Sequence, residues 1–287
     1  MVLWLGLLLG VPTAASSASP PRPSTAPTPS PVRSPGRPDT ATPSPAAAID
    51  GLVDPGSTGH VSIAALDLAT GRSFAYGSGT PIHAASVVKL DVLETLLLQA
   101  QAAGRRLTPD VARSATQMME NSDNDAATRL WGVVGGAEGI AAANVRLGTH
   151  CTHLDDEHWG TSTTCAADQV ALLGALVRPG PLGPAARSYA SDLLTHVEDD
   201  QRWGISAAAD PDAAAGLKNG WLPLDDDDGR WIVNSVGVTT VAHEPVLLAV
   251  LTEHQPSEEA GIALVEALAP RAARAVVAVE APATSAH

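Results

Sequence analysis

The order of strand and helix patterns along this chain constrains its fold more than any other feature. Residues 60–67 alternate apolar and polar side chains, and residues 69–71 form a turn that leads back into a second strand pattern. Segments that fit strands in this way lie at 60–67, 72–76, 213–221, 231–239 and 246–252. Strands at both ends of a helical middle predict one antiparallel sheet, completed by both ends of the folded part.

The middle of the chain carries helical patterns. Residues 87–103 are apolar nearly all round and end at Gly104, which is typical of a helix buried on most faces. Other helical patterns lie at 110–120, 125–134, 137–146, 167–177, 185–197 and 258–268. We therefore expect an α/β chain of the α+β type, with helices flanking the antiparallel sheet and a second, all-helical lobe.

The first 47 residues do not fit this pattern. Residues 1–11 are almost wholly apolar and precede small residues, so residues 1–18 are predicted to be a cleaved export signal. The apolar run is shorter than the roughly 20 residues of a bilayer span, and a retained anchor is the alternative. Ten prolines among Ser, Thr and Arg indicate a disordered tether at 19–47. The folded domain is expected at 48–272, followed by a tail at 273–287.

Composition narrows the possible partners. The chain has 17 basic and 31 acidic residues, a net charge of −14, and residues 1–47 contribute +2, which leaves −16 for the rest. Such a charge repels phosphate backbones and anionic lipid surfaces. We therefore expect no nucleic-acid partner. The N-terminal signal predicts a protein that is secreted, extracellular or associated with the cell wall, with no stable membrane span in the mature form. We also expect a monomer.

The chain contains two cysteines, Cys151 and Cys165. An even pair in an exported chain predicts a disulfide rather than two free thiols. Closing a loop of about 15 residues contributes roughly 3 kcal/mol in the chain-entropy model. The bridge would hold one irregular segment without organising the fold.

Ser86 and Lys89 form the first pair with chemical meaning. Three residues apart at the start of the buried helix, they project from one face with Cβ atoms about 5 to 6 Å apart. A serine hydroxyl needs a base within hydrogen-bond reach, and a lysine withdrawn from water can lose its proton and act as one. Alone, the pair also fits an ordinary helix-start serine followed by a lysine whose stem covers apolar surface.

Two further triplets complete a pattern. Residues 122–124 (Ser-Asp-Asn) either cap the next helix or direct a hydroxyl and a carboxamide into a cleft. Residues 218–220 (Lys-Asn-Gly) fit a surface lysine, or a lysine beside a glycine that admits a close neighbour. In order, the motifs read S-x-x-K, S-D-N and K-N-G, close to the S-x-x-K, S-D-N, K-T-G signature. Over most of residues 50–270 the chain resembles class A β-lactamases and their relatives, the penicillin-binding proteins.

The resemblance implies a fold and a set of roles. The fold would be that of β-lactamases and transpeptidases. Ser86 would attack the amide or lactam carbonyl, Lys89 would accept or relay its proton, and Ser122 would pass a proton to the leaving nitrogen. Backbone N–H groups of Ser86 and Trp221 would form the oxyanion hole.

The resemblance also implies a set of substrate-binding residues, which would be Asn124, Lys218, Asn219, Gly220 and Trp221. The ligand would be a small β-lactam or a D-alanyl peptide, with neither cofactor nor metal.

The chain also departs from the family. Asn219 stands where the third motif normally has a hydroxyl, and the short connection between the first two motifs predicts that one rim of the cleft is missing. Residues 147–160 lack the E-x-x-L-N pattern of the glutamate that activates water for deacylation. Glu157 or His158 lies within one residue of the expected base. If neither side chain reaches the site, we expect acylation followed by slow hydrolysis.

Metal sites are the weaker alternatives. Residues 150–158 contain three histidines, three acids and Cys151, a composition that also fits zinc. A disulfide and a solvated loop explain them better. Residues 225–228 are four aspartates before Gly229, which fits a turn between strands better than calcium ligands at spaced positions.

Three functions fit these features. The first is a serine hydrolase that opens β-lactam amides through a covalent acyl-enzyme. The second is a D-alanyl-D-alanine carboxypeptidase or transpeptidase acting on peptidoglycan with slow deacylation. The third is a non-catalytic, tethered domain that binds the cell wall. Because Ser86, Lys89 and Lys218 are all present, the sequence favours an enzyme.

Overall fold

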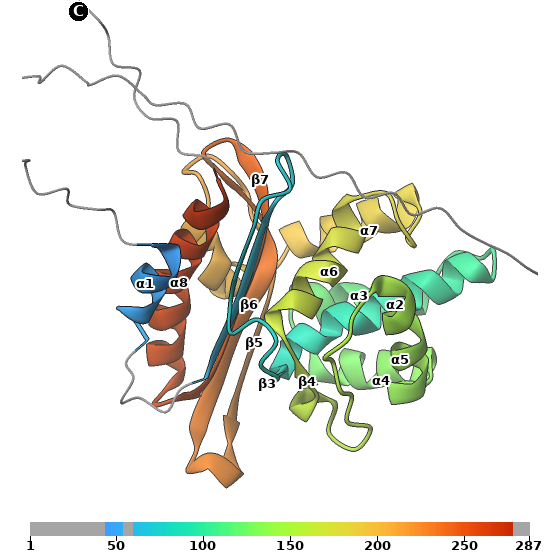
Figure 1. The fold of residues 1–287 in the computed structure, drawn as a ribbon. Helices are drawn as coiled ribbons and strands as arrows, with labels where there is room; N and C mark the ends of the chain where they lie inside the picture. Colours follow the sequence, from blue (N-terminus) through green and yellow to red (C-terminus); the bar gives the residue numbers. More distant parts are fainter. Residues whose placement is uncertain (1–43, 54–59, 278–287) are drawn as a thin grey trace, which may run out of the picture. The chain divides into compact units, whose positions relative to one another are not determined.

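A five-stranded antiparallel sheet forms the centre of the folded part, as predicted (Figure 1). The computed structural model describes residues 44–53 and 60–277, which lie within one compact unit, Pro43–His287. The spatial order is β2-β1-β7-β6-β5, with β1 at Val61–Asp67, β2 at Ser73–Tyr76, β5 at Gly216–Leu224, β6 at Arg230–Val241 and β7 at Glu244–Gln255. β1 pairs with β7 along its whole length, from Val61 opposite Thr252 to Asp67 opposite Val246. Both ends of the domain therefore complete one sheet.

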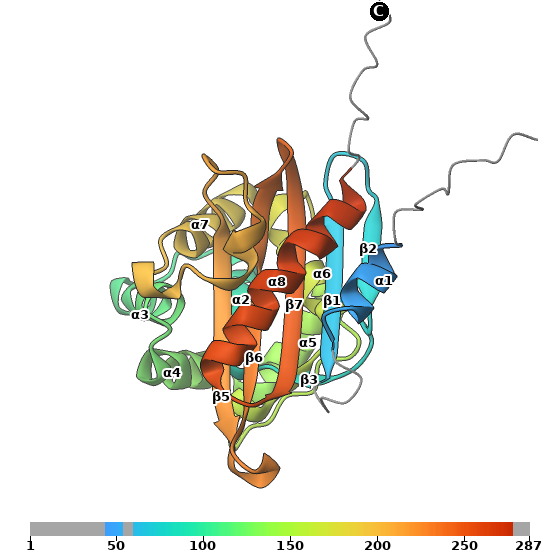
Figure 2. The same cartoon turned by 90° about the vertical axis from the view of Figure 1, so that its left-hand side faces the viewer.

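Helices cover both faces of this sheet (Figures 1 and 2). On one face lie α8 (Glu258–Val276) and the short α1 (Pro45–Asp50). The helical lobe on the other face contains α2 at Lys89–Ala102, α3 at Pro109–Glu120, α4 at Asn124–Val134, α5 at Gly136–Leu147, α6 at Ala166–Val177 and α7 at Pro184–Thr195.

Strand β7 shows how the two layers share one core. Its even-numbered residues Val246, Leu248 and Val250 pack in the cluster that contains α8. Its odd-numbered residues, among them Leu247 and Leu251, pack in the cluster of the helical lobe. Because successive strand side chains point to opposite faces, a continuous apolar run is what a strand covered on both faces requires.

Helix α2 lies at the centre of the helical lobe because it is apolar on nearly every face. Every residue from Lys89 to Leu98 is buried, polar members included. Nδ2 of Asn144 on α5 donates to Asp91 at 2.9 Å. Burial raises the pKa of Asp91 to about 7 and raises the pKa of Glu94 well above its ordinary value.

Two helix boundaries differ from the prediction. α8 continues past residue 268 through Pro270 to Val276, into the segment expected to be the tail. Ala272, Ala273 and Val276 are fully buried beside the sheet. Burial of this apolar surface outweighs the loss of the backbone hydrogen bond that Pro270 cannot donate. At the other end, α1 begins at Pro45, inside the segment expected to be the tether.

The predicted export signal at 1–18 and the tether up to residue 43 lie outside the described residues, as does the chain after 277. Within the described ranges, none of the helices combines the length and the hydropathy needed to span a membrane.

Candidate active site

Ser86 lies on a short 3-10 helix, η1 (Ala85–Val88), that leads directly into α2. Ala85 has a φ of 46°, in the left-handed region that strains a non-glycine residue. Nδ2 of Asn234 on β6 donates to the carbonyls of the two residues that precede η1, at 2.8 and 3.0 Å. The sheet therefore holds the strained turn in place, and the side chain of Ser86 remains partly exposed.

Strand β5 packs directly against this turn at Gly220. A Cβ at this position would lie 2.7 Å from the amide nitrogen of Ser86, 2.8 Å from that of Val87 and 3.0 Å from the carbonyl oxygen of Ala84. These are backbone atoms, so the absence of a side chain is what lets the edge strand approach so closely. Trp221, the next residue, is half-buried, and its ring contacts that of Trp203 edge to face, with centroids 5.8 Å apart.

Lys89 lies one turn after Ser86 and is fully buried. Its Nζ donates to the carbonyl oxygen of Ser122 at 2.6 Å, to Oγ of Ser122 at 3.1 Å and to Oδ1 of Asn124 at 2.8 Å. Burial lowers the pKa of Lys89 to about 7, and the charge of Asp123 offsets only part of this effect. A substantial fraction of this amine is therefore uncharged at neutral pH.

Residues 122–124 cap the next helix and also bring two polar side chains to Lys89. Asp123 is the N-cap of α4, and its Oδ1 accepts from the amide of Ala126 at 2.6 Å. On either side of it, Ser122 and Asn124 contact Lys89. Ser122 has a φ of 54°, so the chain bends sharply between α3 and α4 at the residue that contributes the hydroxyl.

Lys218 on β5 contacts the same hydroxyl as Lys89. Its Nζ donates to Oγ of Ser122 at 2.9 Å and to the carbonyl oxygen of Asn219 at 2.8 Å. Lys218 is fully buried, and burial together with the nearby charge of Lys89 lowers its pKa well below the ordinary value. Ser122 thus bridges two lysine amines, with no carboxylate hydrogen-bonded to either amine among the described residues.

Asn219 is oriented differently from Lys218, as expected for neighbours on a strand. Its side chain is 1% exposed, and Nδ2 donates to the carbonyls of Gln201 at 2.7 Å and Trp203 at 3.3 Å. These carbonyls belong to the segment of two 3-10 helices, η3 (Asp199–Gln201) and η4 (Gly204–Ala208). The carboxamide therefore fastens this segment to β5.

A cavity of about 600 Å³ opens beside these residues, lined by Asn124, residues 157–161 and residues 222–225. Glu157 and His158 lie on its rim with exposed side chains. Their amides donate to Oδ1 of Asp155, at 2.8 and 3.0 Å, which fixes the backbone of the loop. Nζ of Lys89 lies 5.1 Å from the centre of the Trp159 ring, so an aromatic ring covers the buried amine.

Cys151 and Cys165 form a disulfide, which confirms the predicted pairing. Asp168 on α6 strengthens the same segment by accepting from the amide of Cys151 at 2.8 Å and from the hydroxyl of Thr152 at 2.7 Å. The sulfur of Cys151 is bonded to Cys165, so Cys151 is removed from the ligand set of the alternative zinc site. The aspartate run forms the predicted turn, with the 3-10 helix η5 (Asp225–Asp227) between β5 and β6.

Sequence reasoning did not single out two residues of this site. Asn234 is a buried polar residue within an apolar strand, and that pattern was the available signal. In the sequence, Trp159 only marks the end of the altered loop. Its contact with Lys89 depends on how that loop folds.

A family model described as "Beta-lactamase enzyme family" matches residues 105–276. The chain belongs to this family. The curated relatives include "Putative lipoprotein LppW" of Mycobacterium tuberculosis and of Mycobacterium bovis, each 30% identical over 209 residues, or 70% of this chain. The chain spans 65% of the length of these relatives.

Solved structures show the same fold. PBP-A covers 80% of this chain and 95% of its own at 18% identity, with a TM-score of 0.70. A variant of the last common ancestor of the class A β-lactamases of Gram-negative bacteria covers 79% and 97% at 26% identity, with a TM-score of 0.66. A β-lactamase from Streptosporangium roseum covers 80% and 97% at 20% identity, with a TM-score of 0.67. The β-lactamase-like architecture expected from the sequence is therefore present.

Proposed function

We propose that this protein is a serine hydrolase that opens β-lactam amides through a covalent acyl-enzyme on Ser86. The observation that carries the proposal is the meeting of Lys89, Ser122 and Lys218 beside the serine turn, in one hydrogen-bonded group. A nucleophile, an adjacent base and a proton relay are the parts that acyl transfer requires.

In this proposal Lys89 is the base. Its amine is held by oxygen acceptors on Ser122 and Asn124, and its pKa of about 7 matches proton transfer at neutral pH. Ser86 loses its proton to Lys89 as its oxygen bonds to the lactam carbonyl carbon. The developing oxyanion is then stabilised by the backbone N–H groups of Ser86 and Trp221. Gly220, the residue before Trp221, supports this role because it lets β5 pack against the amide of Ser86.

Ser122 completes the proton path. The lactam C–N bond breaks as the Ser122 hydroxyl donates a proton to the leaving nitrogen, and the amine of Lys89 replaces that proton. Two lysine amines share this hydroxyl without a carboxylate partner among the described contacts, so a substrate carboxylate would be bound favourably beside Lys218. In our account Asn219 does not contact the substrate carboxylate. Its carboxamide is hydrogen-bonded to backbone carbonyls and so supports β5, the strand that carries Lys218.

Deacylation is expected to be slow. Two acids line the cavity, Glu157 of the altered loop and Asp225 after β5, and both are exposed. Glu157 has no side-chain contact among the described hydrogen bonds and ion pairs. The ring of Trp159 lies over Lys89, where a water for hydrolysis would need access. A positioned general base contributes typically 10² to 10⁴-fold, so its loss leaves a long-lived acyl-enzyme.

The slow step favours a second candidate of the same chemistry, a D-alanyl peptidase or transpeptidase of peptidoglycan. PBP-A has this fold, and a point mutant of PBP-A has been solved as an acyl-enzyme complex with penicillin G. The relatives named as lipoproteins support a location at the cell envelope. A non-catalytic wall-binding domain is the third candidate.

Intact mass spectrometry after exposure to a penicillin tests the proposal. We expect wild type to gain one penicillin mass and hold it for many minutes, whereas Ser86→Ala gains none. An adduct that forms equally on Ser86→Ala would refute the nucleophile assignment. Parallel incubation with a D-alanyl-D-alanine peptide, followed by assay of released D-alanine, separates the two enzymatic candidates.

A further inference from the structure

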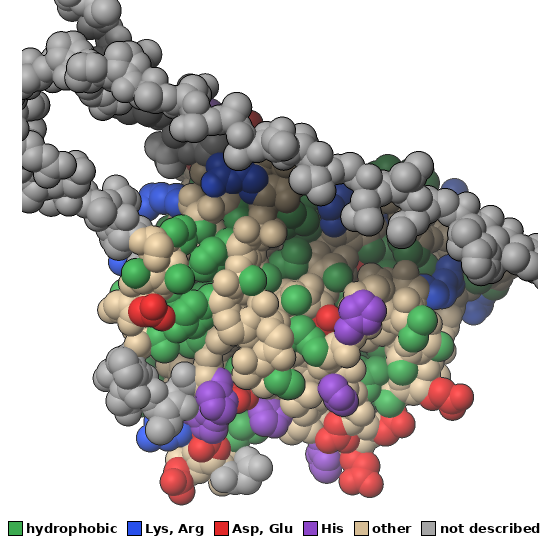
Figure 3. Space-filling model, viewed as in Figure 1, with side chains coloured by type: hydrophobic (Ala, Val, Ile, Leu, Met, Phe, Trp, Pro, Cys, Tyr) green, Lys and Arg blue, Asp and Glu red, His purple; other side chains and the backbone are tan. Residues whose placement is uncertain are grey.

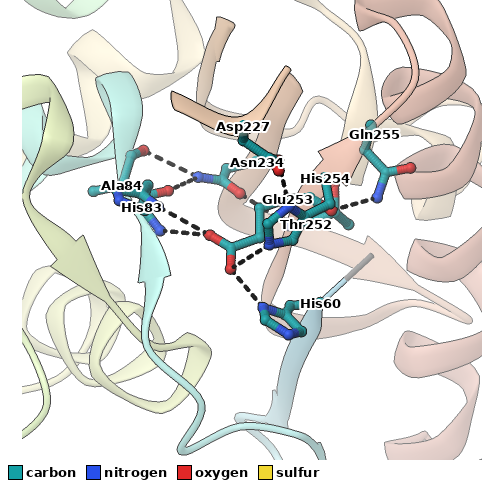
Figure 4. Close-up of polar contacts among 9 residues, drawn as sticks. All are labelled: His60, His83, Ala84, Asp227, Asn234, Thr252, Glu253, His254 and Gln255. Atoms are coloured by element: carbon teal, nitrogen blue, oxygen red, sulfur yellow. Dashed lines mark hydrogen bonds and ion pairs between the residues drawn. The ribbon is translucent and has the colours of Figure 1, made fainter. Parts of the chain in front are cut away.

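A second cluster of titratable side chains lies at the C-terminal end of β7 (Figure 4). His60 lies just before β1, Glu253 and His254 are on β7, and Asp227 comes from the β5–β6 turn. Glu253 is 7% exposed, and His60 is the most open member with its side chain 57% exposed. The proposed hydrolase uses none of these four residues.

The ligand atoms have spacings that suit a metal ion. Nδ1 of His60 lies 2.7 Å from Oε1 of Glu253, and Nε2 of His254 lies 3.6 Å from the same oxygen. All three atoms lie within 4.8 Å of one another. Ligands about 2.0–2.1 Å from a tetrahedral zinc ion are about 3.3 Å apart. The observed distances bracket this value, so small side-chain rotations would bring the three atoms around one ion.

Neighbouring groups orient these atoms as ligands. Nδ1 of His254 contacts the carboxylate of Asp227, which leaves Nε2 directed toward Glu253. A carboxylate on the far ring nitrogen is the usual support of a histidine that binds metal. The other oxygen of Glu253, Oε2, accepts from the backbone amide of His83 at 3.3 Å and contacts its Nδ1 at 3.0 Å. The carboxylate of Glu253 and the imidazole of His254 are thus each oriented by a neighbouring residue on the side away from the proposed ion.

The backbone is distorted where the cluster forms. Val233 on β6 pairs with Thr252, but Trp231 pairs with Gln255, so two residues of β7 lie opposite one residue of β6. His254, in this bulge, has a φ of 60°, which strains a non-glycine residue. Successive strand residues normally face opposite sides, and the bulge instead lets Glu253 and His254 turn toward one another (Figure 4).

Charge also favours a cation here. The four consecutive aspartates of the β5–β6 turn include Asp227, and the folded part carries a strong net negative charge. Figure 3 shows histidine and acidic side chains together along the lower edge of the molecule.

We propose that His60, Glu253 and His254 bind a transition-metal ion, with Zn²⁺ the best match to two imidazoles and one carboxylate. Three protein ligands leave a fourth position for water or another small ligand. Asp227 is a positioning residue that acts through His254. The alternative is a purely hydrogen-bonded cluster that binds no metal.

The test uses the full chain, stripped with a chelator and dialysed, with Zn²⁺ and Co²⁺ as probes. Calorimetry should show one Zn²⁺ per chain, and the Co²⁺ form should have the visible absorption of a four-coordinate site. His60→Ala removes an exposed ligand with little risk to folding and should weaken Zn²⁺ binding at least ~100-fold. Asp227→Asn should weaken it about 10- to 100-fold.

His243→Ala is the matched control, because His243 also faces an aspartate, Asp210, but lies outside the cluster. It should bind Zn²⁺ as wild type does. Circular dichroism of each metal-free variant verifies that it is folded. No stoichiometric uptake by wild type, or uptake unchanged in His60→Ala, would overturn the proposal and leave the hydrogen-bonded cluster. Because the readout is metal affinity, it is independent of whether Ser86 reacts with a penicillin.

Discussion

Replacement of Gly220 by alanine tests how the serine turn is positioned. The new Cβ would lie 2.7 Å from the amide nitrogen of Ser86, whereas ordinary contact begins at 3.4 Å, so β5 and η1 must separate by about 0.7 Å. Because every close neighbour is a backbone atom, no side-chain rotation relieves the contact. Overpacking of this kind costs about 1–3 kcal/mol of unfolding free energy. In a domain of this size, that lowers Tm by about 2–12 °C.

The effect on acylation should be larger than the effect on stability. A misplacement approaching 1 Å at a reacting group costs on the order of 10²-fold in rate. We expect Gly220→Ala to be folded at about 25 °C and to form the penicillin adduct about 10²-fold more slowly, followed by intact mass spectrometry. Gly79→Ala is the control, because a Cβ there meets no heavy atom within 4 Å. If Gly220→Ala had wild-type Tm and acylation rate, the close packing of β5 on the turn would be refuted.

Three further predictions follow from the site and its loop. Lys89 acts as a base in its neutral form and has a pKa of about 7, so the acylation rate should rise about tenfold per pH unit below 7 and level off above it; a flat pH profile would exclude this role. Stopped-flow hydrolysis should show a burst and a slow steady phase, and Glu157→Gln should change neither phase, because the Glu157 side chain is exposed; a slow phase depressed in Glu157→Gln would show that this carboxylate activates water after all. Cys151→Ser with Cys165→Ser should lower Tm by about 6–12 °C, from roughly 3 kcal/mol of loop closure; an unchanged melting curve would show that the bridge adds no stability.

Sequence periodicity was sufficient to predict the helix that is buried on most faces and the strand whose apolar and polar residues alternate regularly. The apolar run after Ser86 predicted the central helix, and the alternation from residue 60 predicted β1. The continuation of α8 through Pro270 could not be seen locally, because it depends on burial of Ala272 and Ala273 beside the sheet. In that helix, tertiary packing outweighs the local signal of a proline.

The same distinction holds within the site. The three motifs predicted which residues would meet, and Lys89, Ser122 and Lys218 do so. The orientation of Asn219 depends on the segment that packs behind β5, which spacing does not specify. The cluster around Glu253 escaped prediction because it depends on a register shift between two strands and on residues that are distant in the sequence.

The central claim is that Ser86 forms the covalent acyl-enzyme. After penicillin treatment and denaturation, trypsin should release residues 73–89 as one peptide, because Arg72 precedes it and Lys89 ends it. This peptide also contains Ser73 and Ser78, which serve as internal controls for non-specific acylation. We predict that fragmentation places one penicillin mass on Ser86 and none on the other two serines. An adduct located on any other residue, or a fully unmodified peptide, would contradict the account.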